Sequence, residues 1–370
     1  MTPAQIINRT RTLIALFALR PGQWIYLREL KQSGLFDRQF YLKANPSLHP
    51  FVQKFAERHF ILFGEQAGLY PCPDFSPAAY LKLNPDLSVS KVAPFHHFIR
   101  HGQFENRPSA FPPAKRDSLT VPLPDLTPRT PGHAIAVLCH MYYEELWDEF
   151  STRLSSIDTG FDLFVSITHH GEVSTALKGR IEAEWPGSTV VLMPNHGRDV
   201  FPFVHMVNSR LFEGYAALCK LHTKISPHRA DGHKWRRSLI EGILPPEGTS
   251  ELVGPFIADP KAGILVADGA RYSGAKWWGV NFKPTQELLA RSDIEIEEES
   301  LEFPAGSIYW IKPEVLEMIS NLHLDEEHFE AEQGQTDGTV AHAFERAIGY
   351  LVRSADLEIR EPKDYAVSNG

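Results

Sequence analysis

Cysteine is scarce in this sequence, with three residues among 370: Cys72, Cys139 and Cys219. No two of them form a Cys-x-x-Cys pair, so the sequence predicts neither a disulfide framework nor a zinc motif. Cytoplasmic chemistry is therefore the expectation.

The sequence also lacks an excess of positive charge. Its formal net charge is −9, whereas a general nucleic-acid-binding surface needs concentrated lysine and arginine. Nucleic acid is therefore not an expected partner, and any anion site must be local. The composition, 43% hydrophobic and 22% charged, is that of a globular protein long enough for two domains.

The N-terminal part has no long hydrophobic run. Its apolar stretch, residues 13–19, is too short to span a bilayer, and no small-residue cleavage site follows it. Residues 1–28 contain four arginines and no acidic residue. They are either an amphipathic helix packed on its own domain or a helix lying on an anionic membrane surface, peripheral on the inner face of the cytoplasmic membrane.

An internal repeat follows. "FDRQFYLKANPSL" (36–48) and "FSPAAYLKLNPDL" (75–87) align without gaps, and each precedes a histidine-containing segment that ends in glycine, "HFILFG" (59–64) or "HFIRHG" (97–102). Each unit predicts a short helix, an Asn-Pro turn and a second helix that ends at the glycine. The histidines are expected to pack rather than to bind metal.

The two units, 36–70 and 75–107, predict a small all-α repeat domain over residues 1–107. The motif resembles repeats appended to bacterial surface-polysaccharide glycosyltransferases. Residues 108–131 then contain seven prolines, which disfavour helix and central strand and predict an extended linker. The second domain is expected over 132–370.

This second part alternates between two patterns. Continuous apolar segments at 134–140, 161–168 and 188–193 are typical of buried strands, and the amphipathic segments 143–154 and 174–185 of helices. The alternation predicts a parallel α/β sheet covered on both faces. Ligands of such sheets bind at the carboxyl ends of the strands.

Polar residues follow the predicted strands at that edge. A strand within 215–228 runs into a cationic segment, and 232–239 opens a helix with further cations. We expect these residues to bind an anionic ligand, most simply a diphosphate; a salt-bridged structural cluster, or a surface ion pair of Arg198 with Asp199, is the alternative. The candidates are His140, Asn195, Arg198, Asp199, His222, Thr223, Lys224, Lys234, Arg236 and Arg237.

Five segments carry a resemblance to a known family. "NHGRDVFPF", "LCKLHTKIS", "WWGVN", "FPAGSIYWIKP" and "EQGQTDGTVAHAFER" occur in that order, and the stretch from about 134 to 360 resembles the rhamnan synthesis protein F family. The resemblance implies a glycosyltransferase that moves rhamnose or another sugar from a nucleotide-sugar donor to a lipid-linked or polysaccharide acceptor. Other assembly glycosyltransferases are then expected as possible partners.

A GT-A-like fold is the expectation for this domain, because roughly 240 residues after the linker are short for the two Rossmann domains of a GT-B fold. Many GT-A enzymes hold a divalent metal with Asp-x-Asp, and this chain contains no such motif. We therefore expect no metal cofactor. Lys224, Arg198 and His222 would supply the positive charge for the departing diphosphate.

Inverting transfer also needs a carboxylate base. The segment 330–346 offers Glu332 and Asp337 near a glycine-rich turn, although Asp337 is equally suited to be the N-cap of the following helix. His342 and Arg346, four residues apart on one helix face, are candidates to orient the carboxylate or reach the donor.

The acceptor site is predicted in two segments. Trp278 and Asn281 lie in a loop that could hold a sugar, with buried packing of the tryptophan as the alternative. Residues 303–313 predict one strand in which Ser307 follows a glycine and allows close approach of a ligand. The acidic run 292–302 is expected to be a solvated face.

A second class of function stays open. The protein could be a noncatalytic sugar-binding module of a polysaccharide-assembly complex. Carboxylates in a turn separate from a cationic strand-end cluster favour an enzyme.

Overall fold

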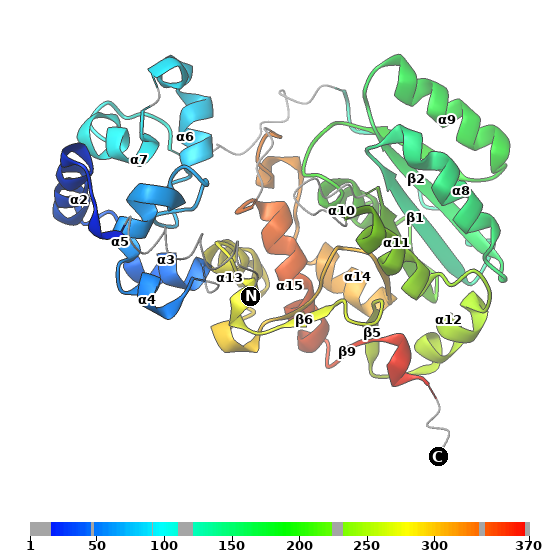
Figure 1. Cartoon of the computed structure of the whole chain (residues 1–370). Helices are drawn as coiled ribbons and strands as arrows, with labels where there is room; N and C mark the ends of the chain where they lie inside the picture. The colour runs from blue at the N-terminus through cyan, green and yellow to red at the C-terminus, as the bar shows by residue number, and fades with distance from the viewer. Residues whose placement is uncertain are drawn as a thin grey trace. The chain divides into compact units, whose positions relative to one another are not determined.

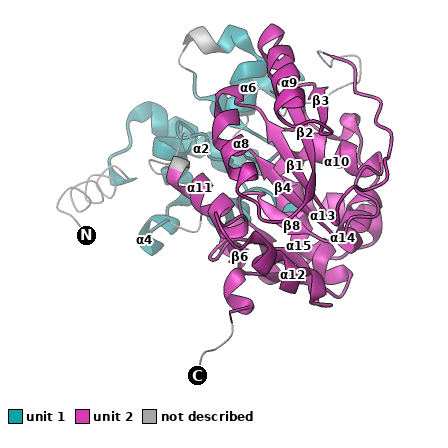
Figure 2. Ribbon diagram, turned by 90° about the vertical axis from the view of Figure 1, so that its right-hand side faces the viewer, with its two compact units in different colours: residues 1–112, 278–283, 334–338 teal, residues 113–277, 284–333, 339–370 magenta. Residues whose placement is uncertain are grey.

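The computed structural model describes residues 16–45, 48–90, 92–109, 121–223, 232–332 and 337–366. They form two compact units (Figures 1 and 2). Unit 1 comprises residues 1–112, 278–283 and 334–338, and unit 2 comprises 113–277, 284–333 and 339–370. The change of unit at 112/113 falls within the predicted linker. Two later segments also belong to unit 1, so the units are not two consecutive stretches of chain.

Unit 1 is built from short helices. Two of them begin at side chains that cap the helix, since Asp37 accepts a hydrogen bond from the Phe40 amide and Ser76 from the Ala79 amide. Proline occupies the first turn of four of them, where its missing N–H costs nothing. The elements are α2 (Pro21–Ser33), α3 (Arg38–Ala44), α4 (Pro50–Gln53), α5 (Ala56–His59), η1 (Phe60–Gly64), α6 (Pro77–Leu83), η2 (Pro85–Ser90), α7 (Pro94–His97) and η3 (Phe98–Gly102).

The two sequence repeats have the same local structure. The Tyr41 hydroxyl lies 2.8 Å from His59 Nδ1, and the equivalent Tyr80 hydroxyl lies 2.8 Å from His97 Nδ1. The asparagine of each Asn-Pro turn donates to the carbonyl of the same tyrosine, 2.8 Å in the first repeat and 2.7 Å in the second. These two histidines therefore have the packing role predicted for them.

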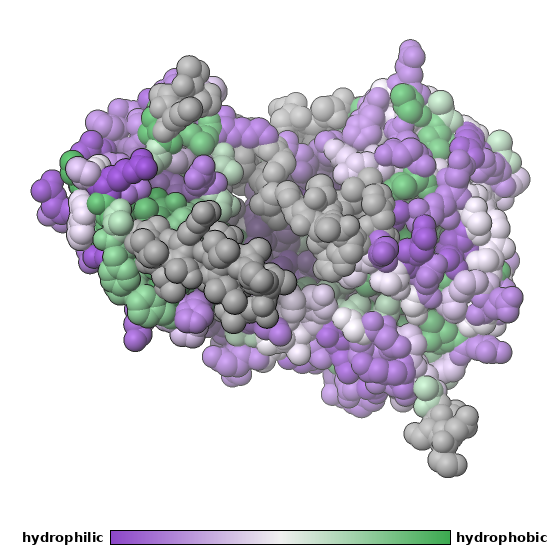
Figure 3. Space-filling model, viewed as in Figure 1, coloured by the Kyte–Doolittle hydropathy of each residue, from purple (hydrophilic) through white to green (hydrophobic). Residues whose placement is uncertain are grey.

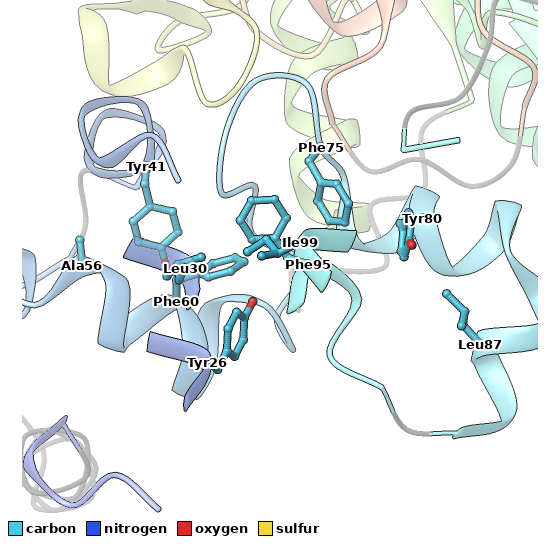
Figure 4. Packing of buried hydrophobic residues seen from close by; sticks show 10 residues of the cluster. All are labelled: Tyr26, Leu30, Tyr41, Ala56, Phe60, Phe75, Tyr80, Leu87, Phe95 and Ile99. Carbon is cyan, nitrogen blue, oxygen red and sulfur yellow. The ribbon is translucent and has the colours of Figure 1, made fainter. Parts of the chain in front are cut away.

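Aromatic side chains make up most of the core of unit 1 (Figure 4). Phe60 meets Phe95 edge-on with ring centroids 5.7 Å apart, and Phe75 lies 4.7 Å from Phe95. These contacts join residues of the first repeat to residues of the second. The repeats thus share one core instead of each building its own.

Unit 2 contains a seven-stranded sheet in the order β3-β2-β1-β4-β8-β5-β9. Strands β1 to β4 are mutually parallel, as predicted. β8, however, is antiparallel to both β4 and β5. The strands are β1 (Ile135–Met141), β2 (Phe161–Thr168), β3 (Thr189–Met193), β4 (Ala217–His222), β5 (Ala262–Leu265), β8 (Tyr309–Ile311) and β9 (Glu358–Arg360).

The single strand predicted over 303–313 is wrong. The segment splits into β7 (Glu302–Pro304), which pairs with β6 (Arg271–Ser273) in a separate two-stranded sheet, and β8. The turn between them has positive φ at Gly306 (90°) and at Ser307 (57°). Such backbone ends a strand, because it turns the chain out of the pleated plane.

Helices cover both faces of the large sheet (Figure 2). α8 (Trp147–Ser155), α9 (Glu172–Glu184) and α11 (Gly232–Ile243) lie on one face, and α10 (Val200–Asn208), α14 (Pro313–Ser320) and α15 (Val340–Ser354) on the other. The remaining helical elements are η5 (Glu144–Leu146), α12 (Thr249–Ala258), η6 (Ala275–Trp277), α13 (Phe282–Leu289), η7 (Ala290–Ser292), η8 (Glu298–Ser300), η9 (Glu326–His328) and η10 (Pro362–Asp364).

Within the ranges described, none of the helices is both long and apolar enough to cross a bilayer.

The order of the strands locates the site. The chain proceeds outward from β1 through β2 to β3 and then returns through α10 to β4, on the other side of β1. The connections that leave β1 and enter β4 therefore diverge, which makes a topological switch point. Open α/β sheets bind ligands in the crevice at the carboxyl ends of the two strands that flank such a point.

The tyrosine in each repeat leaves no room for a larger residue at the closing glycine, and this can be tested at Gly64. A methyl group there would collide with the Tyr41 hydroxyl, so we expect Gly64→Ala to lower the free energy of unfolding by about 1–3 kcal/mol. Gly22→Ala is the matched control, because nothing lies within 4 Å of a Cβ at that position. Urea denaturation followed by circular dichroism measures both.

Tyr41→Phe removes the colliding oxygen, so adding it to Gly64→Ala should cost less than the sum of the two single changes. Equal stability of Gly64→Ala and Gly22→Ala would contradict this account of the repeat.

Candidate functional site

The turn before α10 has an unusual backbone. Gly197 and Arg198 follow one another with φ of 56° and 59°. Position 197 requires glycine, because a Cβ there would collide with the Cβ of Phe201. A non-glycine residue in the left-handed region costs roughly 1 kcal/mol, and such strain tends to occur at functional sites. The turn sets Arg198 and Asp199 at the start of α10, next to the switch point.

Arg198 and Asp199 are not paired with each other, so the surface ion pair considered for them is wrong. The Asp199 carboxylate lies 2.6 Å from Lys220 Nζ, and the Arg198 guanidinium lies 4.0 Å from the Glu332 carboxylate. The adjacent residues Arg198 and Asp199 thus contact different partners. Asp199 binds inward to the sheet, and the Arg198 side chain stays 35% exposed.

Lys220 is the residue around which the site is built. Its side chain is 1% exposed, and its ammonium group donates to Asp199 (2.6 Å), to the Ser307 carbonyl (3.0 Å) and to Ser307 Oγ (3.0 Å). An ammonium group has three N–H donors, and these three acceptors use all of them. Lys220 therefore joins β4, the start of α10 and the β7–β8 turn.

The charge of Asp199 is held by its neighbours. Burial raises the pKa of its carboxyl, but the positive charges of His222 and Lys220 and the Lys220 hydrogen bond outweigh burial, and the pKa lies well below its usual range. Asp199 is consequently ionised throughout the physiological range. A buried charge is tolerated only with such a partner.

The β7–β8 turn contacts β4 and α15 through its backbone. His222 Nε2 donates to the Gly306 carbonyl (2.9 Å), and the Gly306 amide donates to Glu345 Oε1 (2.8 Å). Arg346 in turn donates to Glu345 Oε2 at 2.9 Å. Gly306 has a φ of 90°, which strains any residue with a side chain, and a Cβ there would also force Leu239 Cδ1 to move.

Two glutamates precede α15. Glu330 accepts hydrogen bonds from the Val340 amide at 3.0 and 3.1 Å, so its carboxylate caps the helix. Burial raises the pKa of both Glu330 and Glu332, and the neighbouring Arg198 opposes part of the rise at Glu332. Glu332, 20% exposed beside Arg198, is therefore a carboxylate with an elevated pKa at the edge of the site.

His140 is buried next to the site rather than open to it. It is the register partner of His222 across β1 and β4, and its ring nitrogens contact Ser166 Oγ (3.0 Å) and Thr168 Oγ1 (3.3 Å). Burial lowers its pKa to about 3, against a smaller opposing effect of Asp199. The imidazole is thus neutral and brings no positive charge to a diphosphate.

Several predicted residues have structural partners. Thr223 Oγ1 accepts from the Tyr142 and Tyr143 amides, 2.8 and 3.1 Å away, and so holds the loop after β1. Arg236 pairs with Glu149 of α8 at 2.7 Å. His342 Nδ1 lies 2.8 Å from the hydroxyl of Thr339, the N-cap of α15. Lys224 lies outside the described residues, whereas Asn195 is described and exposed.

The N-cap role considered for Asp337 is wrong, because α15 begins at Val340 after Thr339. In unit 1, Asn281 Nδ2 donates to Asp337 Oδ1 at 2.8 Å, and the Gly338 amide donates to Asn281 Oδ1 at 3.2 Å. Asn281 is fully buried and Trp278 is 1% exposed, edge-on to Phe282. The structure therefore supports the packing alternative for Trp278 and Asn281 rather than a sugar-binding surface.

Sequence reasoning missed Lys220 and Glu345. A signal existed for Lys220, which interrupts the apolar strand "ALCKLH" two residues before His222 and so shares its face of the sheet. Among the residues that the structure describes, no three histidine, cysteine, aspartate or glutamate side chains form a cluster able to hold a metal ion.

Comparisons with known proteins identify a family. The family model described as "Rhamnan synthesis protein F" matches residues 122–357. Two Xanthomonas campestris pv. campestris strains carry relatives, each described as "Uncharacterized protein WxcX", that are 32% identical over 242 residues, or 65% of this chain. The aligned part is 34% of those relatives, so the chain spans about a third of their length.

Among solved structures, the mannosyltransferase PcManGT from Pyrobaculum calidifontis, in complex with GDP-Man and Mn²⁺, matches 77% of this chain and 66% of its own. The identity is 13% and the TM-score is 0.35. A likeness at this level carries no argument about ligand or mechanism.

The Asp199–Lys220 pair should dominate the stability of unit 2. Asp199→Ala leaves a buried ammonium without a counter-charge, and we expect a loss of about 3–5 kcal/mol in the free energy of unfolding. Glu213→Ala, which breaks the exposed pair of Glu213 with Arg210, is the control and should cost under about 1 kcal/mol. Adding Lys220→Met to Asp199→Ala should recover part of the loss.

The effect of Asp199 also depends on pH. Because its pKa in the folded state is depressed below the ordinary 3.8, the stabilisation is fully present above that value and is lost as the pH falls below it. The stability difference between the native chain and Asp199→Ala should therefore shrink in acid. A loss at neutral pH no larger than that of Glu213→Ala would show that the pair is dispensable.

Proposed function

The chain belongs to the rhamnan synthesis protein F family, and on this basis we propose that it is a glycosyltransferase of bacterial polysaccharide synthesis. It moves a sugar, rhamnose or another sugar that is often a deoxy sugar, from a nucleotide donor to a growing surface polysaccharide of the O-antigen or capsule type. Because the aligned part is only 34% of the length of its curated relatives, the proposal concerns this chain and not the full length of those relatives.

One observation carries the proposal. At the switch point, where an α/β sheet binds its ligand, a partly exposed arginine stands 4.0 Å from a partly exposed carboxylate of raised pKa. Transfer from a nucleotide sugar needs these two groups, a cation for the departing diphosphate and a base for the acceptor hydroxyl. Beneath them, the Asp199–Lys220 pair holds the backbone in place.

The proposed reaction is an inverting displacement. The acceptor oxygen forms a bond to the anomeric carbon while the bond to the diphosphate oxygen breaks and the nucleotide diphosphate leaves with the electron pair. Glu332 takes the proton of the acceptor hydroxyl, and Arg198 stabilises the charge on the diphosphate. We assign the base to Glu332 rather than Asp337, because the Asp337 carboxylate is bound to Asn281.

We further propose a GT-A-like fold without a catalytic metal. The chain has no Asp-x-Asp motif, and Asp199, the carboxylate beside the end of β4, is engaged by Lys220. In the part of the chain that the structure describes, this arrangement favours a donor site without a divalent ion, and Arg198 is the group proposed to provide positive charge. The helical repeats would contact acceptor or partner enzymes.

The test is donor turnover with a panel of nucleotide sugars. We expect release of nucleotide diphosphate from at least one donor, and a loss of tenfold or more in kcat/KM for Arg198→Ala, since a charge-assisted hydrogen bond contributes roughly 1.5–3 kcal/mol. Arg210→Ala is the matched control: Arg210 is also an arginine with positive φ, 58°, and it should keep full activity.

The same assay tests Glu332. Because burial raises its pKa, the rate should fall with decreasing pH through a value above the ordinary 4.5, and Glu332→Gln should lose both turnover and this acidic limb. A folded protein that releases nucleotide from no donor would instead be a noncatalytic sugar-binding module.

Metal independence is tested on the same reaction. Turnover should persist after treatment with a chelator and dialysis, because the proposed charge on the diphosphate comes from Arg198. Abolition by the chelator, with recovery on addition of Mg²⁺ or Mn²⁺, would refute this part of the proposal and leave the transferase itself intact.

A further inference from the structure

Unit 1 exposes several large hydrophobic side chains near its N-terminal end (Figure 3). Phe17 is 57% exposed, Trp24 50%, Ile25 42% and Phe51 38%. Buried residues of the same region, Tyr26 among them, belong to the core of the unit. α2 therefore packs on its own unit with one side and leaves a second apolar side uncovered.

The exposed side chains are in contact. The ring of Phe17 lies 6.2 Å from that of Phe51 and edge-on to Phe55 at 5.1 Å. The Arg58 guanidinium lies 5.1 Å from the centre of the Trp24 ring and 5.6 Å from that of Phe55. These contacts join α2 and the residues just before it to α4 and to the start of α5. We call this surface the aromatic face: Phe17, Trp24, Ile25, Phe51, Phe55 and Arg58.

Positive charge surrounds this face. Arg28 is exposed and lies four residues after Trp24, which places both on one side of α2, and the exposed Arg20 is the N-cap residue of the same helix. Lys31 and Lys54 are exposed as well. Among the residues that the structure describes, none forms an ion pair with these four side chains, and residues 16–28 contain no acid.

The nearest acid along the helix is already neutralised. Glu29 pairs with Arg100 and His96, both at 2.7 Å, and the Arg100 hydrogen bond lowers the pKa of its carboxyl to about 2, with burial opposing and His96 assisting. On a chain of net charge −9, this face thus combines local positive charge with exposed aromatic rings.

We propose that the aromatic face binds the surface of an anionic lipid bilayer. Exposed cations beside tryptophan and phenylalanine are also the composition of amphipathic helices that lie in the membrane interface. Arginine and aromatic residues also occur in protein–protein interfaces, but lysine, present here as Lys31 and Lys54, is depleted from the cores of such interfaces. Each basic residue near an anionic membrane contributes about 1 kcal/mol, and the aromatic rings add the apolar anchor that charge alone does not give.

This inference does not depend on the proposed function. The face belongs to unit 1 and Arg198 to unit 2, so lipid binding and donor turnover are measured on separate variants. A chain that turns over donor and ignores vesicles would overturn the inference alone.

The experiment is sedimentation of the full chain with vesicles of phosphatidylcholine and phosphatidylglycerol in equal parts, compared with phosphatidylcholine alone. We expect binding to the mixed vesicles at about 0.1 M salt and its loss at about 1 M, where the Debye length falls to roughly 3 Å. The double variant Arg20→Gln, Arg28→Gln should bind about thirtyfold more weakly, at about fivefold for each charge.

Trp24→Ala should weaken binding about tenfold through loss of apolar contact, and Trp24→Phe should restore most of it. Phe104→Ala is the matched control, because Phe104 is 75% exposed in the same unit and is not part of the face. Thermal unfolding verifies that each variant is folded.

Two results would overturn the inference. One is equal binding to both kinds of vesicle, or none to either. The other is that Trp24→Ala leaves vesicle binding unchanged but dissociates a dimer seen by light scattering, in which case the face is an interface between two copies of the chain.

Discussion

The buried ion pair of Asp199 with Lys220 is the interaction on which the rest of the site depends. A lysine that is 1% exposed in the middle of a sheet needs a counter-charge and acceptors for its remaining protons. Asp199 and Ser307 provide them. Because these residues come from the start of α10 and from the β7–β8 turn, satisfying one ammonium group brings three distant segments of chain to the same sheet edge.

The pair also explains why the neighbouring positions 198 and 199 have different roles. Asp199 is bound by Lys220 of the sheet, and after the strained turn at Gly197 and Arg198 the arginine side chain stays 35% exposed beside Glu332. Glu332 is brought there by the segment that also carries Glu330, the carboxylate that caps α15. The partly exposed Arg198 and Glu332 are thus supported by groups whose own charges are already paired or hydrogen-bonded.

Unit 1 follows a different principle, since its repeats are held by aromatic packing and by a tyrosine–histidine hydrogen bond that occurs once in each copy. The closing glycine of each repeat is required by the tyrosine ring that lies against it. With the tyrosines and phenylalanines of the core turned inward, the aromatic side chains near the start of the unit remain at the surface, flanked by arginine and lysine.

Features that depend on a local pattern could be predicted from the sequence. The first three strands and the two helices between them were predicted because continuous apolar segments and the 3.6-residue periodicity are visible within about ten residues. Arg198, Asp199 and Glu332 could be named as candidates because motifs at strand ends and turns are local as well. The contacts of those residues could not be predicted, because they depend on the tertiary fold. The partner of Asp199 is Lys220 rather than Arg198, β8 runs antiparallel, Trp278 is buried, and Thr339 rather than Asp337 begins α15. Each of these contacts depends on which distant segment of the chain lies adjacent in space. At the site, the buried charge of Lys220 requires a counter-charge, and this requirement rather than a local preference brings Asp199 next to it.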